Sequence, residues 1–181
     1  MSVKIIACVG KNMELGKHGD LCFHIPEDMK FFREMTKDAV VIMGSTTLDS
    51  FPGRAPLKNR VNIVLIDCPE KIRPEAVAAA EADKAAGKRT ELIYVRSVEE
   101  ALEAAKGFPP ESVFVIGGAS VYRTFLPYCD ECLVTINDCH ESADVFYPNL
   151  EESGEWRMTD ESEMHEWEGI RFRFTTWKKI Q

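Results

Sequence analysis

The sequence has 181 residues, of which 45% are hydrophobic and 29% are charged, and its net charge is −8. This composition is that of a globular domain, and the acidic balance argues against a protein that binds nucleic acid or a membrane surface through its overall field. No apolar run is long enough to span a bilayer, and the N-terminal segment lacks a secretion-signal pattern. We therefore expect one domain over residues 1–181, in the cytoplasm.

Short β-branched segments are predicted to form strands, and several are continuously apolar, which is typical of strands covered on both faces. These segments are residues 3–9, 39–44, 61–66, 91–95, 112–118 and 132–137. Helical patterns lie at residues 26–36, 46–51, 74–87, 97–106 and 119–126. Strands that alternate with helices predict an α/β fold with a mostly parallel central sheet flanked by helices.

The ends of some predicted elements carry their own signals. Ser97, with Glu100 three residues later, is a capping box at the start of the helix at 97–106. After residue 150 the sequence alternates polar and apolar residues, with a turn signal at 168–169. We expect this region to form an antiparallel hairpin at the edge of the sheet.

Asp28 lies on an unexpected face of the helix predicted at 26–36. It shares a stripe at helical spacing with the apolar residues Phe32 and Met35. One interpretation is structural, because a carboxylate in the first turn of a helix is stabilised by free backbone N–H groups and by the helix dipole. The other is functional, with the acid facing a ligand.

Two predicted strands end in glycine and lead directly into a helix. The first turn contains Gly44, Ser45, Thr46 and Thr47, and the second contains Gly117 and Gly118. Such turns lie at the carboxyl ends of parallel strands, where ligands bind and where helix N-termini favour anions. The pair indicates an elongated ligand with two anionic groups, such as a dinucleotide. Ordinary tight turns are the alternative, since any α/β protein has several. The Rossmann fingerprint G-x-G-x-x-G is absent.

The cysteines raise the question of a metal site. Cys129 and Cys132 have Cys-x2-Cys spacing, and Cys139 with His140 follows, so zinc is an alternative. No second Cys-x2-Cys accompanies them, and Cys132 leads straight into an apolar strand. We expect no metal and reduced, free thiols.

Several segments together resemble the dihydrofolate reductase family from residue 4 to the last strand. In chain order they are IIACVGKNMELG, IPEDMKFFREMT, VVIMGSTTLDSF, RVNIVL, VFVIGGASVYRTFLP, LVTIN and DVFYP. The resemblance implies NADPH-dependent reduction of 7,8-dihydrofolate to 5,6,7,8-tetrahydrofolate for one-carbon metabolism. It also implies a monomer that binds dihydrofolate and antifolate-type molecules. Residues 67–91 are the main expected insertion.

The resemblance assigns Asp28 to the pterin pocket, where it would hold the pterin N–H groups and assist protonation of N5. An apolar site would raise the pKa of this acid toward the range in which it can act. Leu21, in a mobile loop at residues 10–24, would shield the nicotinamide. The resemblance implies a substrate-binding set of Ile6, Cys8, Asp28, Met29, Phe32, Leu57, Arg60, Ile116 and Thr135. Within it, Arg60 would clamp the glutamate carboxylate.

The resemblance also implies a cofactor site and a cis peptide between Gly117 and Gly118. The cofactor set is Cys8, Leu15, Gly16, Gly44, Ser45, Thr46, Thr47, Leu65, Ile66, Asp67, Arg96, Gly117, Gly118, Ala119, Ser120, Val121 and Tyr122.

The sequence departs from the family's pattern at several of these positions. Phe23, which the resemblance places in the catalytic set with Asp28 and Leu21, stands where bacterial members commonly have a tryptophan that positions a water, and Cys22 replaces a proline. Near the 2′-phosphate, Ser45 and Ser120 replace basic residues, and Asp67 replaces a hydroxyl residue. A carboxylate beside a phosphate is repulsive. We therefore hypothesise a weakened preference for NADPH, with NADH usable and Arg96 as a compensating cation.

Two alternatives remain beside folate reduction. One is a pteridine or riboflavin-pathway reductase on the same fold, whose members typically lack the acid at position 28 and the arginine at position 60. The other is a nucleotide-binding module without catalysis, which would need only the two glycine turns.

Overall fold

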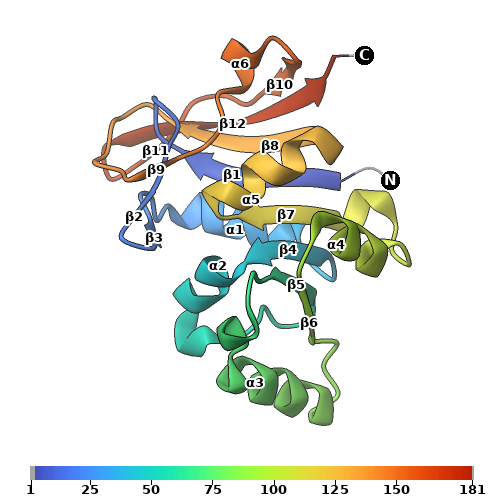
Figure 1. Ribbon diagram of the computed structural model, residues 1–181. Coiled ribbons are helices and arrows are strands. Elements are labelled where there is room, and N and C mark those ends of the chain that lie inside the picture. The colour runs from blue at the N-terminus through green and yellow to red at the C-terminus, as the bar shows by residue number, and fades with distance from the viewer. Residues whose placement is uncertain (1–2, 181) are drawn as a thin grey trace.

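The computed structural model describes residues 3–180, and within them a nine-stranded sheet forms the centre of the molecule (Figure 1). The strands are β1 (Val3–Val9), β4 (Val40–Gly44), β5 (Val61–Leu65), β6 (Glu91–Val95), β7 (Val113–Gly117), β8 (Cys129–Asn137), β10 (Trp156–Glu161), β11 (His165–Trp167) and β12 (Ile170–Lys179). They run in the order β10-β12-β8-β1-β7-β4-β5-β6, and β11 pairs with β12.

The sheet is parallel from β8 to β6 and antiparallel at its C-terminal edge. β1 runs parallel to β7 and β8, and β4 runs parallel to β5 and β7. β12 runs antiparallel to β8, and β10 and β11 run antiparallel to β12. The predicted mostly parallel sheet with a C-terminal antiparallel hairpin is therefore confirmed. Glu168 and Gly169 both have positive φ, as the predicted two-residue turn between β11 and β12 requires.

The helices cover both faces of the sheet (Figure 1). They are α1 (Pro26–Met35), α2 (Ser45–Ser50), α3 (Pro74–Ala85), α4 (Val98–Ala105), α5 (Ala119–Phe125) and α6 (Leu150–Ser153). Phe31 and Phe32 of α1 pack against Ile6, whereas α4 and α5 share a core cluster with Ile5. Because neighbouring residues of a strand face opposite sides, α1 lies on one face and α4 and α5 lie on the other.

A small second sheet was not predicted. It consists of β2 (Glu14–Lys17), β3 (Asp20–Leu21) and β9 (Val145–Phe146), in the order β3-β2-β9. The segment 10–24, which we expected to be a loop, therefore contains a hairpin tied to a strand more than a hundred residues away. The main chain also forms short 3-10 turns, η1 (Pro52–Arg54), η2 (Pro69–Lys71), η3 (Pro110–Ser112) and η4 (Leu126–Tyr128).

The Cys-x2-Cys segment lies inside a strand, because β8 begins at Cys129, three residues before the predicted start. Cys129 and Cys132 are buried, and burial raises the pKa of the Cys132 thiol to about 12. The described part of the chain contains no group of three or more His, Cys, Asp or Glu side chains arranged to hold a metal ion. Among residues 3–180, no helix has both the length and the apolar character needed to cross a membrane.

Candidate active site

A cleft of about 860 Å³ lies at the carboxyl ends of the parallel strands. Its walls come from the last residues of β1, β4, β5 and β7, from the start of α1, and from the small sheet. This is the edge at which open parallel sheets bind ligands. The size is well within the range of small-molecule sites, roughly 300–1,000 Å³.

Asp28 lies in this cleft at the first turn of α1, where it is half-buried. Its carboxylate accepts hydrogen bonds from the Thr135 hydroxyl and the Cys8 thiol. Cys8 and Thr135 are opposite each other in the register of β1 and β8, so the sheet brings both donors to the acid. Burial raises the pKa of Asp28, and the two hydrogen bonds counteract only part of that shift.

The wall around Asp28 is mostly apolar. It contains the predicted residues Ile6, Met29, Phe32 and Ile116, and Phe32 also packs in the core cluster of Ile6. The buried Tyr122 hydroxyl donates a hydrogen bond of 2.8 Å to the Ile6 carbonyl oxygen. Since a carbonyl oxygen has two lone pairs, the Ile6 oxygen keeps one for a ligand.

The two glycine turns lie side by side in the cleft, because Met43 of β4 is opposite Gly117 of β7. The Gly117–Gly118 peptide is cis, as the resemblance implied, and Gly117 has a φ of 123°. A Cβ at Gly117 would lie 3.3 Å from the Tyr122 hydroxyl, and one at Gly44 would lie 3.1 Å from Val121 Cγ2. The missing side chains therefore leave a bare backbone surface for a ligand.

The remaining predicted cofactor residues also line this cleft. They are Leu15, Gly16, Ser45, Thr46, Thr47, Leu65, Ile66, Asp67, Arg96, Ala119, Ser120, Val121 and Tyr122. Leu21 lies at the mouth with 46% of its side chain exposed, where it is placed to cover a ligand.

Asp67, which lines the cleft, has a cationic partner. Its carboxylate forms an ion pair with Lys71 Nζ at 2.8 Å, and this interaction lowers the pKa of Asp67. Lys71 comes from η2, at the start of the insertion, and it also lines the cleft. Together with Arg96, it brings two cations to the position where the sequence indicated an unpaired acid.

Four predicted residues lie off the cleft wall. Phe23 is 4% exposed and packs with Cys8, Ile25 and Phe172 beneath the loop, so it does not face the cleft. Leu57 packs in the core cluster of Val41 and Met43.

Arg60 is the third, and the end of α1 holds it. Its Nε donates to the Thr36 hydroxyl at 3.1 Å, and its terminal nitrogens donate to the carbonyl oxygens of Lys58 and Arg33. Thr135 is fully buried behind Asp28 and reaches the cleft only through that acid.

The sequence interpretation missed several lining residues. They are Ala7, Gly19, Asp20, Ser50, Phe51, Lys71, Arg123, Thr124, Asp144 and Val145. Lys71 had a signal, since it is four residues after Asp67 and opposite charges at this spacing attract in helical segments. Asp144 and Val145 had none, because they reach the cleft only through the pairing of β9 with β2.

Comparison with known proteins agrees with this geometry. A family model described as dihydrofolate reductase matches residues 2–179. The chain belongs to the dihydrofolate reductase family. Dihydrofolate reductase of Mycobacterium tuberculosis (strain ATCC 25618 / H37Rv) is 34% identical over 175 residues, covering 91% of this chain and 90% of the relative. That of Bacillus subtilis (strain 168) is 31% identical over 156 residues, covering 86% and 80%.

Two further comparisons extend this result. A solved dihydrofolate reductase from Enterococcus faecalis, complexed with NADP(H) and RAB-propyl, superposes with a TM-score of 0.80 at 26% identity, covering 99% of this chain and 97% of that chain. A bifunctional dihydrofolate reductase-thymidylate synthase of Daucus carota is 32% identical over 98% of this chain, but the chain spans only 34% of that protein. The similarity to dihydrofolate reductases, which are oxidoreductases, therefore extends over nearly the whole of this chain.

Proposed function

We propose that this chain reduces 7,8-dihydrofolate to 5,6,7,8-tetrahydrofolate with NADPH as the reductant. The single observation that carries this proposal is Asp28, a half-buried carboxylate of raised pKa on an apolar wall, next to the two adjacent glycine turns. Family membership supports the reaction class. Nucleotide binding without catalysis would explain the two glycine turns but not the half-buried carboxylate of Asp28.

Asp28 has two tasks in the proposed reaction. Its carboxylate accepts hydrogen bonds from the pterin amino group and ring N–H, which no apolar side chain could satisfy. It also assists the delivery of a proton to N5, because its raised pKa brings it closer to neutral pH than an exposed aspartate. The Thr135 hydroxyl and the Cys8 thiol keep the carboxylate in one orientation.

The pterin ring would lie between Asp28 and the strand ends. The Ile6 and Ile116 carbonyl oxygens accept hydrogen bonds from its amino group, and Phe32 packs on its face. Met29 contacts the aminobenzoyl tail in this proposal, whereas Leu57, which the resemblance also assigned to the tail, packs against the core cluster of Val41 and Met43. Arg60 binds the glutamate carboxylate, and its contacts to Thr36 and Arg33 hold the guanidinium in place for that task.

The cofactor site fits NADPH on the evidence of its backbone. Gly44, Gly117 and Gly118 leave a surface that side chains would fill, and the backbone N–H groups that follow them have no side-chain cap. NADPH, when bound, supplies the hydride to the pterin carbon next to N5. Leu21 excludes water from this junction.

Lys71 changes our interpretation of cofactor preference. Because Lys71 neutralises Asp67, the repulsion that we expected against the 2′-phosphate is offset, and Arg96 adds a second cation. We propose that Lys71 and Arg96 favour NADPH, and that Asp67 limits the strength of that preference. The use of NADH as a second reductant stays a prediction.

We propose that the 181 residues act as one domain, as a monomer in the cytoplasm, and that antifolates compete with dihydrofolate in the cleft.

The test is loss of reduced-nicotinamide absorbance on addition of dihydrofolate, with NADPH and NADH in parallel, and identification of the product by mass. We expect tetrahydrofolate, with NADPH used more efficiently than NADH. Absence of turnover with both cofactors, in a folded protein, would reject the proposed function.

A further inference from the structure

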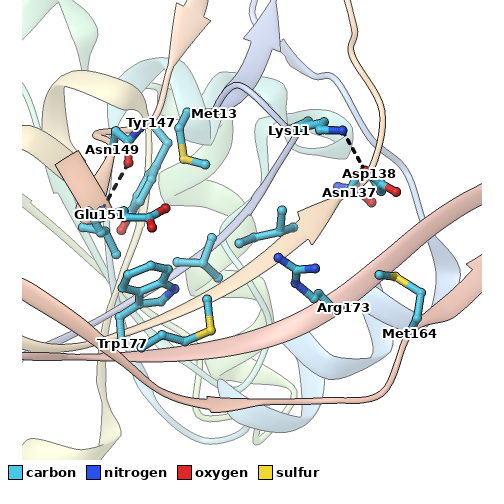
Figure 2. Close-up of a pocket in the computed structure, with 14 residues that line it drawn as sticks. Lys11, Met13, Asn137, Asp138, Tyr147, Asn149, Glu151, Met164, Arg173 and Trp177 are labelled. Carbon is cyan, nitrogen blue, oxygen red and sulfur yellow. Dashed lines mark hydrogen bonds and ion pairs between the residues drawn. The ribbon is translucent and has the colours of Figure 1, made fainter.

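Asn137 is a fully buried polar residue that the proposed mechanism does not yet use. It is the last residue of β8, two residues after Thr135, so its side chain lies on the same face of the sheet as Thr135. The opposite face of β8 carries a second pocket of about 280 Å³, lined by residues that include Met13, Tyr147 and Trp177 (Figure 2). The amide of Asn137 thus belongs to the side of the sheet that holds the cleft.

The Asn137 amide group donates two hydrogen bonds. Its Nδ2 donates to the Val9 carbonyl oxygen at 2.8 Å, which satisfies the backbone near the end of β1. It also donates to Cys8 Sγ at 3.3 Å. Because a thiol has a single proton, a sulfur that accepts from Asn137 keeps its own S–H for a different acceptor.

That acceptor is the Asp28 carboxylate, to which the Cys8 thiol hydrogen-bonds. The three side chains therefore form a chain of donors that runs in one direction, from the Asn137 amide through the Cys8 thiol to the acid. Hydrogen bonds in such a chain polarise one another. Donation from Asn137 therefore both orients the thiol and makes it a better donor to Asp28.

Asn137 occupies its position at a cost in stability. Its Oδ1 is buried without a hydrogen-bond partner among the described residues. Phe172, which is opposite Asn137 in the register of β8 and β12, belongs to an apolar cluster with Cys8 and Ile25. An apolar side chain would suit these surroundings better, because an unpaired buried oxygen is unfavourable. Polar groups placed at such a cost are typical of functional sites.

The other ionisable groups around this chain of donors do not obscure its effect on Asp28. The nearest interact with Cys8 or with the acid itself, and burial raises the pKa of each, so they stay protonated near neutral pH: Cys8, Cys139 and Tyr122. The charged residues elsewhere on the cleft wall are Asp20, Asp67, Lys71, Arg96, Arg123 and Asp144. All of these are unchanged in the variants described below.

We propose that Asn137 is a positioning residue, which holds the Cys8 thiol so that its S–H donates to the Asp28 carboxylate and thereby fixes the orientation of that acid. This inference rests on the proposed function, because it gives Asn137 a part in the proton step at Asp28. A hydrogen bond to the charged form of an acid favours that form. Loss of the Asn137 amide should therefore raise the pKa of Asp28 further.

The experiment is titration of the Asp28 carboxyl ¹³C resonance in the ligand-free protein, identified by its absence in Asp28→Asn. In Asn137→Leu, which removes the amide at similar volume, the midpoint should move to higher pH by roughly half a pH unit. Asn149→Leu is the matched control, because Asn149 caps α6 and does not line the cleft, and its midpoint should not move. An unchanged midpoint in Asn137→Leu would overturn the proposal.

A second set of variants tests whether Asn137 acts through Cys8. Cys8→Ala should also raise the midpoint, and Asn137→Leu added to it should cause no further change. A full additional change without the thiol would show that Asn137 acts by another route, and would reject the positioning role.

Infrared spectroscopy of the wild-type protein keeps the proposal testable even if Asn137→Leu does not fold. The S–H stretching band that is lost in Cys8→Ala should lie below that of an unbonded thiol, and it should move as Asp28 titrates. A band at the unbonded position at every pH would overturn the proposal.

Turnover separates this inference from the proposed function. The alkaline limb of the kcat/KM profile for dihydrofolate should move to higher pH in Asn137→Leu, together with the Asp28 midpoint. Turnover by the wild-type protein with an unchanged midpoint in Asn137→Leu would reject the positioning role alone. A changed midpoint in a protein that does not reduce dihydrofolate would reject the proposed function alone.

Discussion

Asp28 carries both the proposed chemistry and a local cost in stability. A carboxylate with a raised pKa is one whose charged form is less stable in the folded protein than in the unfolded chain. The hydrogen bonds from Thr135 and Cys8 reduce this cost without removing it. Such a residue is typical of a functional site, because stability alone would favour a neutral side chain at this position.

We predict that Asp28→Asn stabilises the fold at neutral pH. The folded protein binds the Asp28 proton more tightly than the unfolded chain, so stability is lost as pH rises from the ordinary value of 3.8 through the raised pKa. The amide does not titrate, so thermal unfolding of the ligand-free variant should occur a few degrees higher at about pH 7. This gain should vanish below about pH 3. A variant that is less stable at neutral pH would contradict the prediction.

Lys71 is predicted to set cofactor preference. In Lys71→Ala, Asp67 loses its partner and faces the 2′-phosphate unpaired, so the ratio of kcat/KM for NADPH to that for NADH should fall by about tenfold. Lys88→Ala is the matched control, because Lys88 pairs with Asp83 at 2.8 Å elsewhere in the insertion and does not line the cleft. An unchanged ratio in Lys71→Ala would remove Lys71 from the cofactor site.

At the scale of elements, hydrophobic pattern and turn chemistry predicted the main sheet well. The strand at 61–66 and the helix at 97–106 were found within one residue at each end, and Ser97 caps α4 through a 3.1 Å bond from the Glu100 N–H. Their local sequences are sufficient because each buries a continuous apolar face. The C-terminal antiparallel hairpin was also predicted, from the alternation of polar and apolar residues after residue 150 and from the turn signal at 168–169.

The small sheet could not be predicted in the same way. β2, β3 and β9 are four residues or fewer in length, and each is defined by a partner rather than by a pattern of its own. The same reason explains why Phe23 lies off the cleft wall. Phe23 was assigned to the cleft by position in the chain, whereas packing against Phe172 of β12 buries it.

Gly117, in the turn after β7, is predicted not to tolerate a side chain. Gly117→Ala would place a side chain at a φ of 123° and 3.3 Å from the Tyr122 hydroxyl, which must hold the Ile6 carbonyl. We expect a loss of about 1–3 kcal/mol in unfolding free energy, by chemical denaturation, with much weaker NADPH binding. Gly107→Ala is the control, since nothing lies within 4 Å of its Cβ position and it should be tolerated. Normal stability and NADPH affinity in Gly117→Ala would contradict the assigned backbone role.

At the scale of the molecule, β8 separates two concave sites. Its Thr135 hydrogen-bonds to Asp28 in the cleft on one face, and Val134 and Ile136 line a second pocket of about 280 Å³ on the other. The net charge of −8 opposes the binding of anionic ligands such as NADPH and dihydrofolate in the cleft. Binding of such ligands therefore depends on local donors such as Lys71 and Arg60.

We predict a monomer in solution. Three of the exposed large apolar side chains, Leu21, Met29 and Val145, line the cleft, so a bound ligand rather than a second copy would cover them. Light scattering coupled to size exclusion should give the chain mass of 20.5 kDa, with and without NADPH. A mass twice as large would contradict this prediction.

The most direct test of the central claim is the pH dependence of dihydrofolate turnover with NADPH, for the wild-type protein and for Asp28→Asn, from about pH 5 to about pH 8. We predict that Asp28→Asn loses roughly 100-fold or more of kcat/KM at about pH 7 and recovers part of it toward pH 5, where the substrate is protonated without the acid. A variant that matches the wild-type protein across this range would show that Asp28 is not the acid of the reaction.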